Sequence, residues 1–237
     1  MPAAMKRWNK FRSRFKNFQE RSREPGLTAL LIVEVLLIFV ATPLAGMEVM
    51  PASVVPGMFA ILIVAILVVA SRSRSAVGIV LIAIVLMPIW AFIQAEHTSL
   101  LTELLSSGAR LLALAVLTYV VAHAVFGPGR VTMHRVQGAV VLYLNFALIF
   151  AVLYRLVMTV LPDAFSGMPQ PEASGATLLY FSFTTLTTTG FGDIAPLHPI
   201  ARDIANLESV IGQLYPATLL ARLVSLEVEH RRQPKST

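Results

Sequence analysis

Cysteine is absent from the 237 residues of the chain, and charged residues make up only 14% of them. Without cysteine the chain can form neither disulfides nor thiolate metal sites. The zinc motif H-E-x-x-H is missing as well, and no Ser–His or Asp–Asp arrangement is evident within the apolar segments, so we do not expect an enzyme. Hydrophobic residues supply 56% of the sequence, which indicates an integral membrane protein.

Six apolar runs come close to the roughly 20 residues that a helix needs to cross a bilayer. They span residues 27–45, 54–70, 76–94, 108–126, 136–161 and 200–226. Between the last two runs, residues 162–199 must leave the membrane, re-enter it as a short helix and return. We therefore predict an all-α membrane protein with six transmembrane helices and one re-entrant helix.

Lysine and arginine are absent from three connecting segments, residues 47–51, 95–107 and 162–199. Basic residues gather in the other connections and at both ends of the chain. Cytoplasmic segments carry an excess of Lys and Arg, so we expect a plasma (inner) membrane protein with both termini in the cytoplasm.

Residues 1–25 hold eight of the nineteen Lys and Arg residues. Their aromatic residues recur at helical spacing, at Trp8, Phe11, Phe15 and Phe18. This pattern is typical of a basic amphipathic helix on a membrane surface rich in anionic lipids. A disordered basic tail that only sets orientation is equally compatible with it. The placement of the charge fits topology better than binding to nucleic acid.

Residues 185–193 read T-L-T-T-T-G-F-G-D and lie between a short apolar helical stretch and the last long one. Non-helical backbone at membrane depth is tolerated only where protein buries it or where it lines a water-filled path. Gly190 and Gly192 permit backbone conformations that a side chain would forbid, so carbonyls can turn toward a common axis. Rings of such carbonyls replace the hydration shell of K⁺ in selectivity filters.

This stretch resembles the signature T-x-T-T-x-G-Y-G-D of the tetrameric potassium-channel family. The resemblance covers residues 136–226, with Thr189 where valine is usual and Phe191 where tyrosine is usual. It implies that K⁺ is the permeant ion, that no organic cofactor is needed and, since each chain has one filter sequence, that four chains form a homotetramer. The K⁺-binding filter residues that it implies are Thr188, Thr189, Gly190, Phe191 and Gly192, with Asp193 at the outer mouth.

The segment before the filter resembles the family's pore helix, from Ser174 or Gly175 to about Thr187, with Ser174 as its N-cap. Tyr180 and Phe181 stand where the family places aromatics behind the filter, although both fit ordinary packing. Thr184 stands where some relatives carry a carboxylate.

The two departures within the filter put stable conduction in question. Phe191 lacks the phenolic hydroxyl that tyrosine would offer, and Thr189 places a hydroxyl where an aliphatic group would pack. A non-selective cation channel is therefore an alternative, as is a transporter or accessory membrane subunit.

In the last apolar run, Gly212 resembles the family's hinge glycine, and Pro216 favours a kink. A glycine and a proline tolerated for close helix packing are the alternative. Gln213, Pro216 and Leu220 are candidates for the cavity wall, and Leu220 and Val224 are candidates for a hydrophobic gate.

Charged residues within apolar runs nearly always find partners. We predict an ion pair between Arg155 and Glu208 behind the filter. Alternatively, Arg155 extends outward to the membrane surface while Glu208 is protonated or bonded to pore-helix threonines. Glu34 and His123 form a second possible pair.

The division that follows is a four-span unit at 26–129, a pore domain at 130–226 that begins with a short linker helix at 130–137, and a tail at 227–237. The fourth run holds only Arg110, whereas steep voltage gating needs roughly 3–4 charges per subunit. We therefore do not expect a conventional voltage sensor. The tail is too short for a ligand-gating domain.

Overall fold

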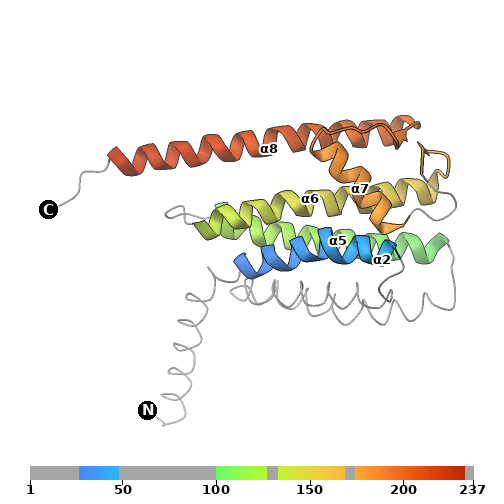
Figure 1. Cartoon of the computed structure of the whole chain (residues 1–237), viewed down its shortest axis with the longest axis horizontal. Helices are drawn as coiled ribbons and strands as arrows, with labels where there is room; N and C mark the ends of the chain where they lie inside the picture. The colour runs from blue at the N-terminus through green and yellow to red at the C-terminus, as the bar shows by residue number, and fades with distance from the viewer. Residues whose placement is uncertain (1–26, 48–99, 127–132, 169–173, 233–237) are drawn as a thin grey trace, which may run out of the picture.

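The computed structural model describes residues 27–47, 100–126, 133–168 and 174–232, and these are almost entirely helical. The predicted surface helix at 1–25 and the second and third predicted spans lie outside the described residues. The described elements are the helical span Leu27–Leu44 with its π-helical turn η1 (Leu37–Ala41), α2 (Thr42–Gly46), α5 (Leu100–Phe126), α6 (Met133–Val160), β1 (Phe165–Ser166), α7 (Gly175–Leu186), β2 (Ala195–Pro196) and α8 (Pro199–Arg232) (Figure 1).

Three described helices are long and apolar enough to cross a membrane, namely Leu27–Leu44, Leu100–His123 and Met133–Val160. They correspond to the first, fourth and fifth predicted spans. The sixth predicted span forms one continuous helix, α8, which is long enough at about 1.5 Å per residue. Polar residues such as Arg202, Asp203 and Glu208 lower its hydropathy, and it is not among these three. Its passage through the membrane therefore stays a prediction.

Two predicted boundaries are wrong. The segment 95–107 is not a loop throughout, because α5 already begins at Leu100 and continues through Gly108. A Cβ at Gly108 would meet nothing within 4 Å, so this glycine marks no tight turn. Met133–Gln137 is not a separate linker helix either, because it is the first part of α6. The Thr28 hydroxyl lies within hydrogen-bonding distance of His134 and Gln137, and this contact fixes the start of α6 against the first span.

Helix α6 is the centre of the arrangement, in contact with α5, α7 and α8. Figure 1 shows α7 inclined between α6 and α8. One apolar cluster joins the first span, α5 and the first half of α6, and includes Leu30, Val121 and Leu142. A second cluster joins the far half of α6 to α7 and the start of α8, and includes Tyr154 and Phe181. The second cluster therefore holds α7 against α6.

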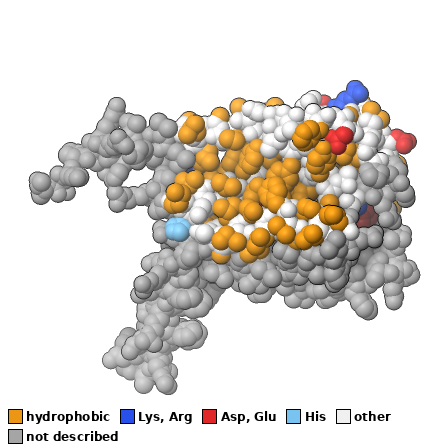
Figure 2. All heavy atoms as spheres, viewed as in Figure 1, with side chains coloured by type: hydrophobic (Ala, Val, Ile, Leu, Met, Phe, Trp, Pro, Cys, Tyr) orange, Lys and Arg blue, Asp and Glu red, His pale blue; other side chains and the backbone are white. Residues whose placement is uncertain are grey.

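Apolar side chains also cover much of the surface. Figure 2 shows hydrophobic side chains spread over the visible face, with the visible Asp, Glu, Lys and Arg side chains gathered toward one end. On α8 the exposed apolar residues include Leu207, Val210, Leu214 and Leu220. An apolar surface of this kind is expected where lipid or another chain covers the protein.

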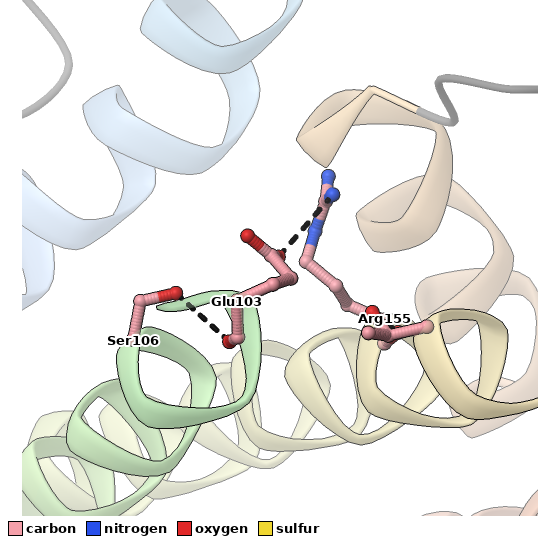
Figure 3. Close-up of polar contacts among 4 residues, drawn as sticks. Glu103, Ser106 and Arg155 are labelled. Atoms are coloured by element: carbon pink, nitrogen blue, oxygen red, sulfur yellow. Dashed lines mark hydrogen bonds and ion pairs between the residues drawn. The ribbon is translucent and has the colours of Figure 1, made fainter. Parts of the chain in front are cut away.

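The predicted ion pair between Arg155 and Glu208 is wrong. Arg155 Nη1 lies 3.7 Å from Glu103 Oε1, and the two side chains point toward each other from α6 and α5 (Figure 3). The Ser106 hydroxyl donates to the Glu103 carbonyl in the same turn at 3.0 Å. The sequence did not indicate this pair, because residues 95–107 were expected to form a connecting segment and Glu103 lies instead in α5.

The possible pair between Glu34 and His123 is also absent. Glu34 is fully buried, and neither of its carboxyl oxygens has a hydrogen-bond partner among the described residues. His123 instead stacks on Tyr119, with ring centroids 6.3 Å apart.

The pair between α5 and α6 gives the first prediction. Arg155→Glu places a carboxylate next to Glu103, and we expect a loss of about 1 kcal/mol of stability, since both side chains are partly exposed. Adding Glu103→Arg restores opposite charges and is expected to recover most of the loss in a thermal unfolding experiment in detergent. Recovery by Glu208→Arg instead of Glu103→Arg would contradict this assignment.

Candidate functional site

Helix α7 begins at a capped N-terminus. Ser174 has extended backbone angles, and its Oγ accepts a hydrogen bond from the Thr177 N–H at 3.1 Å, so the predicted N-cap is confirmed. The helix ends at Leu186, one residue before the predicted end, with Thr187 as its C-cap. Its C-terminal carbonyls carry the negative end of the helix dipole, which favours a cation nearby.

The backbone after α7 alternates between two conformations. Thr188, Gly190 and Gly192 have positive φ values of 55°, 56° and 80°, whereas Thr189 and Phe191 do not have positive φ. In an extended strand successive carbonyls point in opposite directions, whereas an alternation of left-handed and right-handed conformations is able to bring them to the same side. Positive φ is uncommon for a residue with a side chain, and such strain gathers at functional sites. The sequence indicated the two glycines but not Thr188.

Two backbone N–H groups of this segment donate to the end of α7. The Thr188 N–H donates to the Thr185 carbonyl at 2.9 Å, and the Gly190 N–H donates to the Thr184 carbonyl at 3.1 Å. No hydrogen bond in the described part of the chain uses the carbonyls of residues 188–191. The segment is therefore anchored through its N–H groups, and its carbonyls stay available for another ligand.

Residues 187–193 are all exposed in the single chain. A Cβ at Gly190 or Gly192 would meet nothing within 4 Å, so glycine is favoured there by backbone conformation and not by lack of space. The segment thus presents an open face.

Tyr180 contacts the outer end of the segment. Its hydroxyl donates to Asp193 Oδ2 at 2.9 Å, and its ring stacks on Phe191 with an interplanar angle of 5°. A ring without a hydroxyl at position 191 thus still packs against the pore helix. Tyr180 therefore contacts two residues of the segment, and its role in supporting a filter stays a prediction.

Phe181 and Thr184 contribute differently. Phe181 is buried and packs edge-on against Tyr154, with centroids 4.8 Å apart, so it joins α7 to α6. The Thr184 hydroxyl donates within its own helix to the Phe181 carbonyl, and only its backbone carbonyl reaches Gly190. The Thr189 hydroxyl lies 2.8 Å from that of Thr187, so it has a polar partner.

The loops on either side of α7 and the filter are joined. Strands β1 and β2 pair antiparallel, with Phe165 opposite Pro196. Gly167 has φ 75°, and a Cβ there would lie 1.8 Å from the Asp193 carbonyl oxygen. The sequence gives no local signal for this close approach, because it depends on a residue 26 positions later in the chain.

Helix α8 crosses the end of α7 at very close range. A Cβ at Gly212 would lie 1.8 Å from the Leu186 carbonyl oxygen. One residue on, the Gln213 side-chain amide donates to the Thr188 hydroxyl at 2.7 Å. The structure thus supports close packing as the reason for Gly212, and its role as a hinge stays a prediction.

Beyond this crossing, α8 continues through Pro216 as one helix. Leu220 is 63% exposed, as a residue facing a cavity or a neighbour would be. The side chain of Val224, the other predicted gate residue, lies outside the described residues.

Glu208 joins three helices behind the pore helix. It is fully buried, and its two carboxyl oxygens contact the hydroxyls of Tyr154 from α6 and Ser182 from α7. The alternative in which Glu208 bonds to pore-helix threonines is wrong in the residue, because the α7 hydroxyl that contacts Glu208 is that of Ser182.

Residues 138–229 match a family model described as "Ion channel". No curated protein and no solved structure matches the chain. The matched residues include most of α6, all of α7, the filter segment and most of α8, close to the predicted pore domain. The match supports an ion channel of the pore-loop type.

Gly212→Ala tests the close crossing of α8 and α7. The added methyl group meets a backbone carbonyl, so the helices must separate, and we expect a loss of roughly 1–3 kcal/mol of stability. The matched control is Gly108→Ala on α5, where the methyl group meets nothing and a gain of up to about 1 kcal/mol is expected from helix propensity. Equal thermal stability of the two variants would contradict the close approach.

Tyr180→Phe removes the hydroxyl that holds Asp193 and leaves the ring stacked on Phe191. We expect faster hydrogen–deuterium exchange in the peptide covering residues 187–194, measured by mass spectrometry. Tyr119→Phe on α5 is the matched control and is expected to leave this peptide unchanged. Unchanged exchange in Tyr180→Phe would mean that the hydrogen bond does not hold the outer end of the segment.

Proposed function

We propose that the chain is one subunit of a homotetrameric channel that conducts K⁺ passively across the plasma membrane. The observation that carries the proposal is the backbone of residues 188–192, in which φ alternates in sign and the carbonyls lack hydrogen-bond partners among the described residues. Carbonyls directed to one side can replace the water molecules around a desolvated K⁺ ion.

The residue types at the proposed ion sites support K⁺ over a divalent ion. The ligands are neutral carbonyls of residues 188–191 together with the Thr188 hydroxyl, and no carboxylate of residues 188–192 takes part. Asp193 lies at the outer end, where a ring of carboxylates concentrates cations before they enter. Divalent ions such as Ca²⁺ more often bind carboxylate oxygens.

The need to surround an ion supports the proposed assembly of several subunits. A single chain offers one strand of carbonyls with one open face, and an ion needs oxygens all around it. Four copies around one axis supply them. The exposed apolar residues of α8, among them Leu207, Val210 and Leu214, would then face neighbouring subunits, the cavity or lipid.

In the proposed arrangement the chain has six spans and both termini in the cytoplasm, and the filter opens outward. Arg110 is the single arginine or lysine in α5. Because steep voltage gating requires roughly 3–4 charges per subunit, we propose a channel without a conventional voltage sensor.

The test uses the full chain purified into liposomes under opposing K⁺ and Na⁺ gradients. We expect a reversal potential near that of K⁺ and its loss in Gly190→Ala, since alanine disfavours φ near 56° by about 1–2 kcal/mol. Gly175→Ala is the matched control, because it adds the same methyl group at a position with free space and ordinary φ.

Two other outcomes of this experiment would favour a non-selective cation channel or an accessory membrane subunit. Equal permeability to K⁺ and Na⁺ would mean that the channel conducts cations without selecting K⁺. The missing hydroxyl at Phe191 and the polar side chain of Thr189 would then explain the loss of selectivity. The absence of flux under every condition would contradict an autonomous channel and favour an accessory subunit.

A further inference from the structure

We infer that Glu208 is a neutral, protonated carboxyl group in the folded protein, and that in this form it positions the pore helix α7 between α6 and α8. The contacts of the described side chains support this protonation state. Its consequence for conduction rests on the proposed function.

The surroundings of Glu208 are closed to water. Glu208, Tyr154 and Ser182 are each 0% exposed. The Tyr154 ring packs against Phe165 at 5.6 Å and Phe181 at 4.8 Å between centroids, so the carboxyl group lies beside an aromatic cluster. A charge in such a place loses its hydration and needs a partner of opposite sign.

No cation provides that partner. In the part of the chain that the structure describes, no Lys, Arg or His forms an ion pair with Glu208. Arg155, which follows Tyr154 in the sequence, pairs with Glu103. The titratable side chain that contacts Glu208 is Tyr154 on α6, and Tyr143 on the same helix lies within electrostatic range of it. Helix α7 contributes only the Ser182 hydroxyl. Burial without a counter-charge therefore favours the neutral acid.

The hydrogen atoms give an independent argument. Ser182 Oγ lies 2.8 Å from the Ala147 carbonyl oxygen and also contacts Glu208 Oε1. A serine hydroxyl has one hydrogen, and neither a carbonyl nor an ionised carboxylate can donate one. With Glu208 ionised, one of these two oxygen–oxygen contacts would have no hydrogen in it and would be repulsive.

One added proton resolves the conflict. Protonated Oε1 donates to Ser182 Oγ, the Ser182 hydroxyl donates to the Ala147 carbonyl, and the Tyr154 hydroxyl donates to Oε2. Each hydrogen then has one acceptor, and the chain of bonds runs from α6 through α8 to α7 and back to α6.

This chain positions the filter indirectly. Ser182 lies two residues before Thr184, whose carbonyl accepts from the Gly190 N–H. When Glu208 loses its proton, Ser182 can keep only one of its two contacts, and a buried charge is left behind α7. We therefore expect alkaline pH to loosen the pore helix and, with it, the filter. Glu208 is a positioning residue, since it touches no permeant ion.

The first test is infrared difference spectroscopy of the purified full-length protein in lipid at neutral pH. We expect the carbonyl-stretch band of protonated carboxylic acids in the wild type. We expect its intensity to fall in Glu208→Gln, with the remainder assigned to the buried Glu34, and to stay unchanged in Asp203→Asn, which changes an exposed carboxylate on the same helix. If Glu208→Gln removes only the bands of an ionised carboxylate, the proposal is wrong.

The second test is the pH profile of thermal stability. The folded protein holds a proton that the unfolded chain releases, so wild-type stability falls as pH rises, by up to about tenfold in the unfolding equilibrium per pH unit. Glu208→Gln keeps the donor to Ser182 and the acceptor for Tyr154, so it is expected to fold like the wild type with a flatter profile. If Glu208 had only a structural role, the pH profiles of the wild type and of Glu208→Gln would be parallel. Parallel profiles would overturn the proposal.

Ion flux separates this inference from the proposed function. If the liposomes conduct, alkaline pH is expected to reduce flux in the wild type more than in Glu208→Gln, and equal reductions would overturn the positioning role. If neither protein conducts, the channel proposal fails, while the infrared and stability results still decide the protonation of Glu208.

Discussion

The filter segment depends on how its backbone hydrogen bonds are distributed. The N–H groups of Thr188 and Gly190 donate to the last turn of α7, and the carbonyls of residues 188–191 have no partner in the described part of the chain. Unpartnered carbonyls are costly at membrane depth unless an ion or water takes the place of a donor. These carbonyls therefore need an ion or water molecules on the open face of the segment.

Several contacts with α6 and α8 hold α7 in place. Ser174 caps its start, and Gly212 allows the backbone of α8 to touch its last carbonyl. In its middle, the contacts among Tyr154, Ser182 and Glu208 join it to both long helices. These contacts act at three levels along one short helix, so the direction of its C-terminal carbonyls is fixed from several sides.

Much of this could be predicted from the sequence, because the signals were local. Apolar runs of spanning length gave the first, fourth and fifth helices, and the motif around Gly190 located the turn after α7. Interactions between residues far apart in the sequence could not be predicted from such local signals. The pairing of Arg155 with Glu103, the contact of Gly167 with Asp193 and the positive φ of Thr188 depend on how the helices meet. In each case the residue type was compatible with several partners, and packing selected one.

The central claim is that the carbonyls of residues 188–191 bind K⁺, and isotope labelling tests it directly. With a ¹³C label at the Gly190 carbonyl of the protein in lipid, solid-state NMR reports its surroundings during titration with K⁺ or Na⁺. The account predicts a carbonyl shift that saturates with K⁺ and is absent or different with Na⁺. A carbonyl signal that responds to neither ion would contradict the account, because it would mean that the open face is not an ion site.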